Sequence, residues 1–313
     1  MTLPGLAVIT AWRRRWWRRD AAALAAFEGL RPCVVITGAS EGIGFAFAEL
    51  LTAAGSDVLL IARDANRLDA ASEALRLSGS KGRVTVMALD VTAADAVPRI
   101  DDALAANQNY ADILVNNAGS GLSGPFTTQP VAAIENLLSL NVVALTRLTR
   151  HVLAGQLVRG RGGIINLASV GGYVPGPQQA VYYASKAYVI SFSEAIAAET
   201  TGRGVHVMAV APGPIDTGFH SKMQAEGTLM RLLVPQLSAR RVAKSALLGF
   251  WLGHRVVVPG LVNWLLVVCI RVLPHRLLLP LIGNLLRPSA LPVDDGALKP
   301  RHPREVGDGS AKP

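Results

Sequence analysis

The chain has 313 residues, of which 50% are hydrophobic and 17% are charged, enough for one large domain or two small ones with a substantial core. Its two cysteines, Cys33 and Cys269, lie far apart and its six histidines are scattered, which argues against a disulfide framework and a metal site and favours a reducing, cytoplasmic compartment. The net charge of +9 is concentrated towards the two ends, which weakens the case for a nucleic-acid partner and suits anionic lipid at least as well.

Residues 1–30 are expected to form a leader outside the folded domain. Five arginines lie in WRRRWWRRD (Trp12 to Asp20), where Trp12 and Trp16 would share one face of a helix. Tryptophan and arginine together are typical of a membrane interface, so peripheral membrane contact is one hypothesis. A disordered extension, or a translation start further along the chain, is an equal alternative. No signal peptide is indicated, because the arginines follow the short apolar start instead of preceding a long apolar region.

From Arg31 onward, short β-rich runs alternate with longer helical ones. The expected strands cover 33–40, 57–63, 83–91, 112–119, 163–170 and 205–213, with 256–260 as a short seventh. Helices are expected from Gly42, over 66–79, in a stretch ending near Arg159, around Tyr182 and beyond Arg240. Near-continuous apolar strands separated by helices predict a parallel sheet covered on both faces. Right-handed crossovers then make it an α/β fold with a Rossmann-type doubly wound sheet, in a single dinucleotide-binding domain over 31–260.

The segment 261–287 is apolar almost all the way round and is expected to form a helical extension. Arg271, Pro274 and Pro280 interrupt it, so its uninterrupted part is shorter than the roughly 20 residues that a membrane-spanning helix needs. Packing against the domain, a subunit interface and monotopic membrane contact all stay open as hypotheses. The remaining residues, 288–313, are rich in proline, glycine and charge and are expected to be a disordered tail.

The turn TGASEGIG (37–44) joins the first predicted strand to the first helix. Gly38, Gly42 and Gly44 would let backbone amides approach a pyrophosphate, and the start of the helix adds partial positive charge. Their spacing departs from the common G-x-G-x-x-G, and such a turn also occurs as a plain tight connection between strand and helix. Its place on the first strand of a parallel pattern favours the dinucleotide-binding interpretation.

The end of the second strand indicates which dinucleotide binds. An acidic residue there would hydrogen-bond the ribose 2′-hydroxyl of NAD, whereas a nearby arginine accommodates the 2′-phosphate of NADP. Here the strand ends in Arg63, whose guanidinium suits a phosphate. Asp64 follows directly, and a solvated surface arginine is the alternative interpretation. NADP(H) is therefore the predicted cofactor in preference to NAD(H).

A tyrosine and a lysine one helical turn apart, Tyr182 and Lys186, lie within an otherwise apolar run. When a nicotinamide transfers hydride, the protein must donate or accept a proton at the substrate oxygen. A free tyrosine, with a pKa of about 10, is a poor base near neutral pH, and an adjacent ammonium would lower that pKa. Tyr183 is also a helix neighbour of Lys186, so spacing alone does not choose between the tyrosines. Ser169, at the end of the fifth strand, can hydrogen-bond the substrate oxygen.

These motifs, taken in order, resemble the classical short-chain dehydrogenase/reductase family from about Pro32 to Val258. The motifs are T-G-x-x-x-G-x-G at 37–44, Asp90 after the third strand, N-N-A-G at 116–119, Asn141, Ser169, Tyr182-x-x-x-Lys186 and P-G-x-x-x-T at 212–217. Any one of them occurs by chance, but the ordered set is highly specific.

The resemblance implies which residues form the site. It assigns catalysis to Ser169, Tyr182 and Lys186, selects Tyr182 over Tyr183 as the general acid/base, and gives Asn141 a water in a proton relay. It implies cofactor contacts at Thr37, Gly38, Ser40, Gly42, Ile43, Gly44, Arg63, Asp90, Val91, Asn117, Ala118, Gly119, Tyr182, Lys186, Pro212, Gly213, Ile215 and Thr217. It also implies a substrate lid at 214–236, where several apolar side chains hint at a lipophilic substrate, and a dimer or tetramer formed through the helices of Asn141 and Tyr182.

The resulting prediction is an NADP(H)-dependent oxidoreductase, a carbonyl reductase or alcohol dehydrogenase that interconverts a ketone or aldehyde and an alcohol on a lipophilic substrate. A non-catalytic dinucleotide-binding regulator of the same fold is the alternative. Loss of Ser169, Tyr182 or Lys186 would favour that alternative, and all three are present. The expected location is the cytoplasm, with peripheral membrane contact of the two chain ends as a further hypothesis.

Overall fold

The computed structural model describes residues 27, 29–215 and 236–286. Almost all of the predicted leader, most of the predicted lid, Thr217 and the predicted tail lie outside these described residues.

A seven-stranded parallel sheet forms the centre of the described chain, in the order β3-β2-β1-β4-β5-β6-β7. The strands are β1 (Arg31–Thr37), β2 (Asp57–Ala62), β3 (Val84–Ala88), β4 (Asn109–Asn116), β5 (Gly162–Leu167), β6 (Val205–Val210) and β7 (Val256–Val257). The chain order reverses between β1 and β4, so the prediction of a Rossmann-type doubly wound sheet is confirmed. This reversal opens a crevice at the carboxyl ends of the central strands, where such sheets bind ligands.

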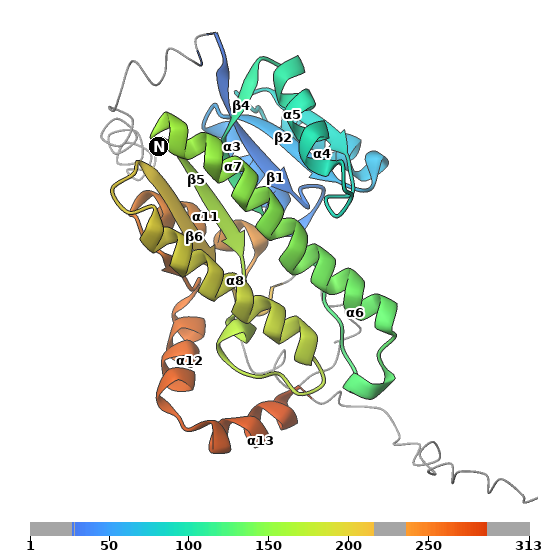
Figure 1. Cartoon of the computed structure of the whole chain (residues 1–313), viewed down its shortest axis with the longest axis vertical. Helices are drawn as coiled ribbons and strands as arrows, with labels where there is room; N and C mark the ends of the chain where they lie inside the picture. The colour runs from blue at the N-terminus through green and yellow to red at the C-terminus, as the bar shows by residue number, and fades with distance from the viewer. Residues whose placement is uncertain (1–26, 28, 216–235, 287–313) are drawn as a thin grey trace, which may run out of the picture.

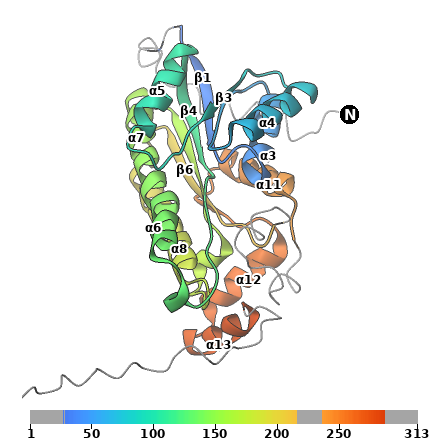
Figure 2. The same cartoon turned by 90° about the vertical axis from the view of Figure 1, so that its right-hand side faces the viewer.

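Helices cover both faces of the sheet (Figure 1), and Figure 2 shows the two layers from the side. One layer contains α3 (Gly42–Ala53), α4 (Ala65–Leu77) and α11 (Ala239–Trp251), and the other contains α5 (Ala96–Ala106), α7 (Leu145–Arg159) and α8 (Ala180–Glu199). Each strand sends alternate side chains to the two layers, because side chains on a strand point to opposite faces. In β1, Val34 and Ile36 enter one core, whereas Cys33 and Val35 enter the other.

Helix α5 is the element that the sequence prediction missed between the third and fourth strands. Pro98 lies in its first turn, where a backbone N–H has no partner inside the helix and proline is tolerated. Ala96, Ile100 and Leu104 are its buried residues, spaced by one helical turn. The spacing was readable in the sequence, but the proline and the neighbouring aspartates obscured it.

A continuous helical run precedes the fifth strand: α6 (Val131–Leu138), the π-helical turn η2 (Ser139–Ala144) and then α7. Among the described residues it is the one helix long and apolar enough, by length and composition, to cross a membrane. In the structure α7 packs along β4 and β5 as part of the helical layer. Its length and apolar character are therefore explained in part by the core that it covers.

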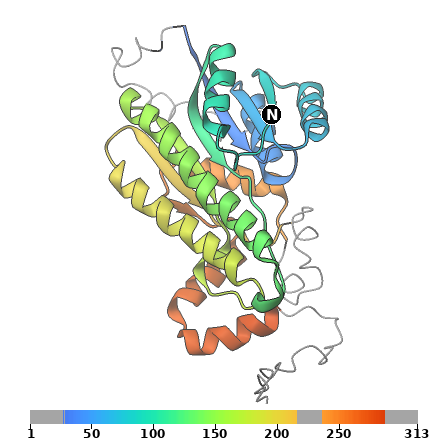
Figure 3. The same ribbon diagram turned by 45° about the vertical axis from the view of Figure 1, so that its right-hand side comes forward.

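The C-terminal helix pair, α12 (Leu261–Val272) and α13 (His275–Leu285), packs beyond the carboxyl ends of the strands (Figure 3). The break between the two helices falls at Leu273 and Pro274, as proline requires. The pair contacts the short helix η3 (Val170–Tyr173) and the start of α8 through a separate apolar cluster. That cluster comprises Leu137, Val174, Tyr182, Tyr183, Ile270, Leu278, Ile282 and Leu286. The structure thus shows that the inner side of the segment 261–287 packs against the domain, which was one of the three hypotheses for it.

Candidate active site

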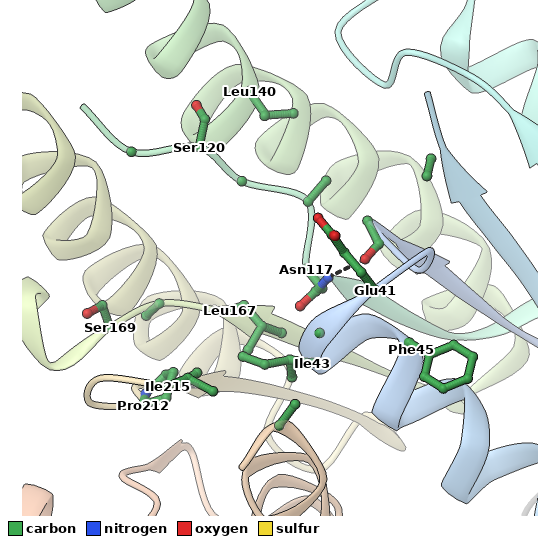
Figure 4. A pocket seen from close by; sticks show the side chains of 18 of the residues that line it. Glu41, Ile43, Phe45, Asn117, Ser120, Leu140, Leu167, Ser169, Pro212 and Ile215 are labelled. Carbon is green, nitrogen blue, oxygen red and sulfur yellow. Dashed lines mark hydrogen bonds between the residues drawn. The ribbon is translucent and has the colours of Figure 1, made fainter. Parts of the chain in front are cut away.

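A cleft of about 1190 Å³ lies at the carboxyl ends of the parallel strands. Figure 4 shows Ser169, Pro212 and Ile215 on one side of it and Glu41 and Asn117 on another. The predicted cofactor residues that line it are Gly38, Ser40, Gly42, Ile43, Arg63, Asp90, Val91, Asn117, Ala118, Gly119, Tyr182, Lys186, Pro212, Gly213 and Ile215. Thr37 and Gly44 lie next to this cleft without lining it, and Thr217 is outside the described residues.

The turn between β1 and α3 has the geometry of a phosphate cradle. Gly38 and Gly42 have φ angles of +62° and +61°, a conformation that glycine adopts without a steric cost. A Cβ atom on Gly38 would lie 2.9 Å from the Cα of Ala118, and one on Gly44 would lie 2.4 Å from the carbonyl oxygen of Gly38. Glu41, the N-cap of α3, makes no side-chain capping hydrogen bond to this helix, so the start of α3 offers backbone N–H groups to an anion.

Thr37 and Asn117 fasten this turn to the loop after β4. The hydroxyl oxygen of Thr37 accepts hydrogen bonds from the backbone N–H groups of Asn117 and Ala118, both at 3.0 Å. The side-chain amide of Asn117 donates to the carbonyl oxygens of Thr37 at 3.0 Å and Gly38 at 2.8 Å. The two motifs therefore act as one unit, and the structure gives Thr37 a bracing position behind the cleft.

The end of β2 places the carboxylate of Asp64 and the guanidinium of Arg63 next to each other in the sequence but in different surroundings. Asp64 is the N-cap of α4; it accepts a hydrogen bond from the backbone N–H of Arg67 at 3.1 Å and pairs with the Arg67 side chain at 3.3 Å. Arg67 also pairs with Glu41 at 3.3 Å. Arg63 and Asp64 both line the cleft, and the Asp64 carboxylate is the one already paired with Arg67.

Asp90 lies at the rim of the same part of the cleft. Its carboxylate accepts hydrogen bonds from the backbone N–H of Thr92 at 2.9 Å and from the Thr92 hydroxyl at 2.7 Å. Partial burial opposes ionisation, but these two hydrogen bonds and the charge of Arg63 together hold the pKa of Asp90 below its usual value. Asp90 is therefore an anion that accepts hydrogen bonds and lies within electrostatic range of Arg63.

Tyr182, Lys186 and Ser169 meet at the other end of the cleft. Tyr182 and Lys186 lie one turn apart on α8, and both are buried. The ammonium of Lys186 donates to the carbonyl oxygen of Leu167 at 2.9 Å and lies 5.8 Å from the centre of the Tyr182 ring. The side chain of Ser169 hydrogen-bonds Tyr182 and also accepts from the backbone N–H of Gly171 at 3.1 Å. A phenol, a hydroxyl and an ammonium thus face one enclosed space.

Asn141 belongs to the wall behind this group. It lies in the π-helical turn η2, and its side chain exchanges hydrogen bonds with the backbone of Ser120 at 2.8 and 2.9 Å and donates to the Ser185 hydroxyl at 3.1 Å. A Cβ atom on Gly119 would lie 3.3 Å from the Asn141 amide oxygen and 3.5 Å from the Lys186 nitrogen. The position of Asn141 fits a residue that holds the loop at Gly119 and Ser120 against Lys186.

Tyr183 lines the cleft too, but its ring is fixed by packing. A Cβ atom on Gly171 would lie 3.1 Å from this ring, and one on Gly176 would lie 2.3 Å from it. The rings of Tyr182 and Tyr183 meet edge to face with their centres 5.9 Å apart. The two glycines therefore leave just enough room for Tyr183 as a supporting side chain of Tyr182.

Burial dominates the ionisation of both groups on α8. It raises the pKa of Tyr182 to about 12, although the hydrogen bond with Ser169 favours the ionised form. It lowers the pKa of Lys186 to about 8. This differs from the sequence expectation that the ammonium lowers the pKa of the phenol, because the loss of hydration is the largest effect and the hydrogen bond with Ser169 is the one that opposes it. At neutral pH, Tyr182 is therefore a protonated acid.

The cleft contains residues that the motifs did not indicate. These are, among others, Glu41, Thr92, Ser120, Leu140, Gln179 and Leu286. Thr92 and Ser120 directly follow predicted motifs and were accessible to sequence reasoning. Leu286 was not accessible to it, because the sequence of the apolar segment 261–287 was equally compatible with packing on the domain, a subunit interface and membrane contact. Most of the predicted lid lies outside the described residues. A β-bridge pairs Ile215, near the start of the lid, with Leu237, the residue directly after its end. Within the described ranges, no group of acidic, histidine or cysteine side chains is placed to hold a metal ion.

Comparison with known proteins connects this geometry to a family. Residues 32–227 match the family model described as short chain dehydrogenase. The very-long-chain 3-oxoacyl-CoA reductase-B of Danio rerio is 33% identical over 207 residues, which are 65% of this chain and 66% of that protein. The chain thus spans just under two thirds of that relative.

Two solved structures are matched over most of their own length. A short-chain dehydrogenase from Sphingobium yanoikuyae in complex with NADPH is 33% identical, with a TM-score of 0.67 over 77% of this chain and 93% of that chain. The bulky-bulky ketone specific alcohol dehydrogenase from Comamonas testosteroni is 30% identical, with a TM-score of 0.64 over 78% and 92%.

The burial of Lys186 predicts a contribution to the free energy of unfolding that rises with pH between about 8 and 9.5. The folded chain releases this proton near pH 8, whereas the unfolded chain holds it up to the ordinary lysine pKa of about 10.5, so in between the unfolded chain binds more protons. The contribution to the slope approaches about 1.4 kcal/mol per pH unit. Burial also raises the pKa of Cys33 to about 12 and that of several tyrosines, and these groups contribute with the opposite sign, so the Lys186 contribution is obtained from the difference between the wild type and a variant that lacks this lysine.

Urea unfolding of the wild type and of Lys186→Met over this range measures that contribution. We expect Lys186→Met to lack it and Lys81→Met, which replaces an exposed lysine, to keep it. An identical pH dependence in Lys186→Met and the wild type would show that Lys186 is not buried as a shifted base.

Proposed function

The chain belongs to the short-chain dehydrogenase family, and from that premise we propose that it is an NADP(H)-dependent oxidoreductase that reduces the carbonyl group of a lipophilic substrate to an alcohol. The observation that carries the proposal is the meeting of Tyr182, Ser169 and Lys186 at one end of a cleft whose other end is a glycine turn. Family membership supports hydride transfer with a nicotinamide nucleotide. The preference for NADP(H), the substrate class and the direction rest on the arguments below.

The side chains at this end of the cleft provide the proton chemistry. The bound nicotinamide supplies the hydride, and the protein supplies the proton to the carbonyl oxygen. Ser169 and Tyr182 offer hydroxyl groups that hydrogen-bond this oxygen, and Tyr182 donates its proton as negative charge develops there. The ammonium of Lys186 and the hydrogen bond with Ser169 then stabilise the phenolate. Burial raises the pKa of Tyr182 to about 12, so the phenol is protonated at neutral pH and can donate the proton that carbonyl reduction needs.

The nucleotide end of the cleft fits a phosphorylated dinucleotide. The glycine turn and the start of α3 suit the pyrophosphate, as the close approaches at Gly38 and Gly44 indicate. Arg63 is placed for a 2′-phosphate, while Asp64, the acidic residue that would otherwise suit a 2′-hydroxyl, is already bonded to Arg67. The NADPH in the Sphingobium yanoikuyae structure supports the same preference by similarity.

The substrate end supports a lipophilic compound. Tyr183 and Leu286 line the cleft and share an apolar cluster with Tyr182, and Leu140 and Val170 add apolar side chains to the same cleft. A very-long-chain 3-oxoacyl-CoA reductase and a bulky-bulky ketone specific dehydrogenase are among the similar proteins, and both names describe large carbonyl compounds. We infer a ketone or a 3-oxoacyl derivative with a substantial apolar part.

The outward faces of α7 and α8 support a homo-oligomer. Val158 and Tyr188 are exposed there, as is Val143 in the adjoining η2 turn. Tyr188 is pre-ordered, because its ring stacks on Phe192 with centres 5.4 Å apart and its hydroxyl hydrogen-bonds Thr146 at 2.8 Å. Contact with a second copy would bury these side chains and account for the apolar character of the long helical run.

The proposed activity predicts that the purified chain oxidises NADPH when it is offered large carbonyl compounds. We expect 3-oxoacyl thioesters, bulky ketones or steroid ketones to be turned over, and small ketones such as acetone to be poor substrates. Absorbance at the NADPH band measures the rate, with NADH as the control and a kcat/KM at least tenfold lower expected for it. Tight NADPH binding without turnover of any carbonyl compound would instead favour the non-catalytic regulator.

The two neighbouring tyrosines provide a matched pair of variants. Tyr182→Phe should lower kcat by about a hundredfold or more, because the proton donor is removed. Tyr183→Phe should keep most of the activity, because its ring and its packing against Gly171 and Gly176 remain. Steady-state kinetics with NADPH binding as the check on folding measures both. Equal losses in the two variants would overturn the assignment of the acid.

Two arginines in the same part of the cleft test the cofactor preference. Arg63→Ala should raise the KM for NADPH by about tenfold or more and leave kcat/KM for NADH almost unchanged, since only NADPH carries the 2′-phosphate. Arg67→Ala is the control, because that guanidinium is paired with Glu41 and Asp64. An equal loss with both nucleotides in Arg63→Ala would contradict the phosphate contact.

A further inference from the structure

Helix α12 carries apolar side chains on the face that points away from the domain. The outer stripe, as we name it, consists of Leu261, Trp264, Leu265, Val268 and Val272, which are 71%, 50%, 48%, 39% and 78% exposed. Apart from the adjacent pair Trp264 and Leu265, successive positions are three or four residues apart, so the five residues form one continuous face of the helix. The opposite face is buried through Asn263, Val267 and Ile270. A continuous apolar face of this kind marks an interaction site, unlike single exposed apolar residues.

The helix pair is held so that the outer stripe cannot turn inward. Asn263 is buried, donates to the carbonyl oxygen of Pro259 at 2.8 Å and fills the space that a side chain at Gly213 would need. The guanidinium of Arg271 lies 5.0 Å from the centre of the Tyr173 ring. On α13, the inner side packs against the cluster around Tyr182. Figure 1 shows α12 at the edge of the molecule. Burial of the stripe therefore requires a partner outside the described chain.

The charge of the helix pair indicates the kind of partner. Within residues 261–286 the charged residues are two arginines, and no Asp or Glu is present. Arg271 and Arg276 are exposed beside and just beyond the end of the outer stripe. Trp264 lies within the stripe, and tryptophan is the side chain most typical of the boundary between lipid headgroups and acyl chains. Apolar residues, a tryptophan and flanking cations without acidic residues match an anionic lipid surface.

We propose that the outer stripe of α12 lies in the surface layer of a bilayer containing anionic lipid and holds the protein peripherally on the membrane. Helix α12 has 12 residues and is about 18 Å long, too short to cross the hydrocarbon core of about 30 Å. The helix therefore lies along the surface. This docking does not depend on the proposed reaction, although it would bring the cleft wall at Leu286 close to membrane-dissolved substrates.

Vesicle flotation of the full-length chain tests the docking without any measurement of turnover. We expect the wild type to float with vesicles of phosphatidylcholine and phosphatidylserine, to float less with phosphatidylcholine alone, and to be released in part by salt. The double variant Trp264→Gln, Leu265→Gln should bind at least about tenfold more weakly, because two large apolar side chains of the stripe are lost.

The control replaces an apolar residue that is even more exposed but lies on a different helix. Leu77, on α4, is 80% exposed, and Leu77→Gln should float like the wild type. Both variants change exposed side chains, so circular dichroism and NADPH binding should match the wild type. These measurements separate a lost membrane contact from a misfolded protein.

Three results would overturn the proposal. The first is that the wild type floats with neither kind of vesicle. The double variant could float as well as the wild type, which would place any membrane contact elsewhere in the chain. Light scattering without lipid could show that the double variant halves the molar mass, which would make the stripe a contact between two copies.

Discussion

The burial of Tyr182 beside Lys186 on α8 is the constraint on which the rest of the site depends. Two ionisable groups lose their hydration there. The loss raises the pKa of Tyr182 and lowers the pKa of Lys186, because it disfavours the charged form of each. Only a rigid surrounding can hold them in that state. The carbonyl oxygen of Leu167, the hydroxyl of Ser169 and the wall behind Gly119 provide it. An acid that stays protonated and a cation that stays close then become available to a substrate.

The same rigidity joins parts of the chain that are distant in sequence. The loops after β1 and β4 are bonded to each other through Thr37 and Asn117, so the nucleotide turn cannot move independently of the loop that backs Lys186. The C-terminal helix pair closes the opposite side by packing against Tyr182 and Tyr183. A helix pair outside the family match at 32–227 thereby takes part in shaping the reactive end of the cleft.

The sequence predicted the elements whose signal is local. Buried strands appear as unbroken apolar runs, and the order of the motifs was enough for the sheet and for part of the lining of the cleft, but not for residues such as Glu41 and Gln179. The choice between Tyr182 and Tyr183 needed the family pattern, because both are helix neighbours of Lys186. The direction in which the pKa of Tyr182 shifts depends on how deeply the side chain is buried, and residue spacing does not predict that depth. The location of 261–287 depends on contacts with η3 and α8 that an apolar composition does not specify.

Leu286 has a consequence for the design of selective inhibitors. It contributes to the cleft from a segment that lies outside the family match, whereas most of the other lining residues belong to the part shared with the family. A compound anchored only at the nucleotide turn and Tyr182 would meet features common to many related enzymes. One that extends to Leu286 would also contact a segment outside the family match, and discrimination between relatives that differ there would come from that distal group.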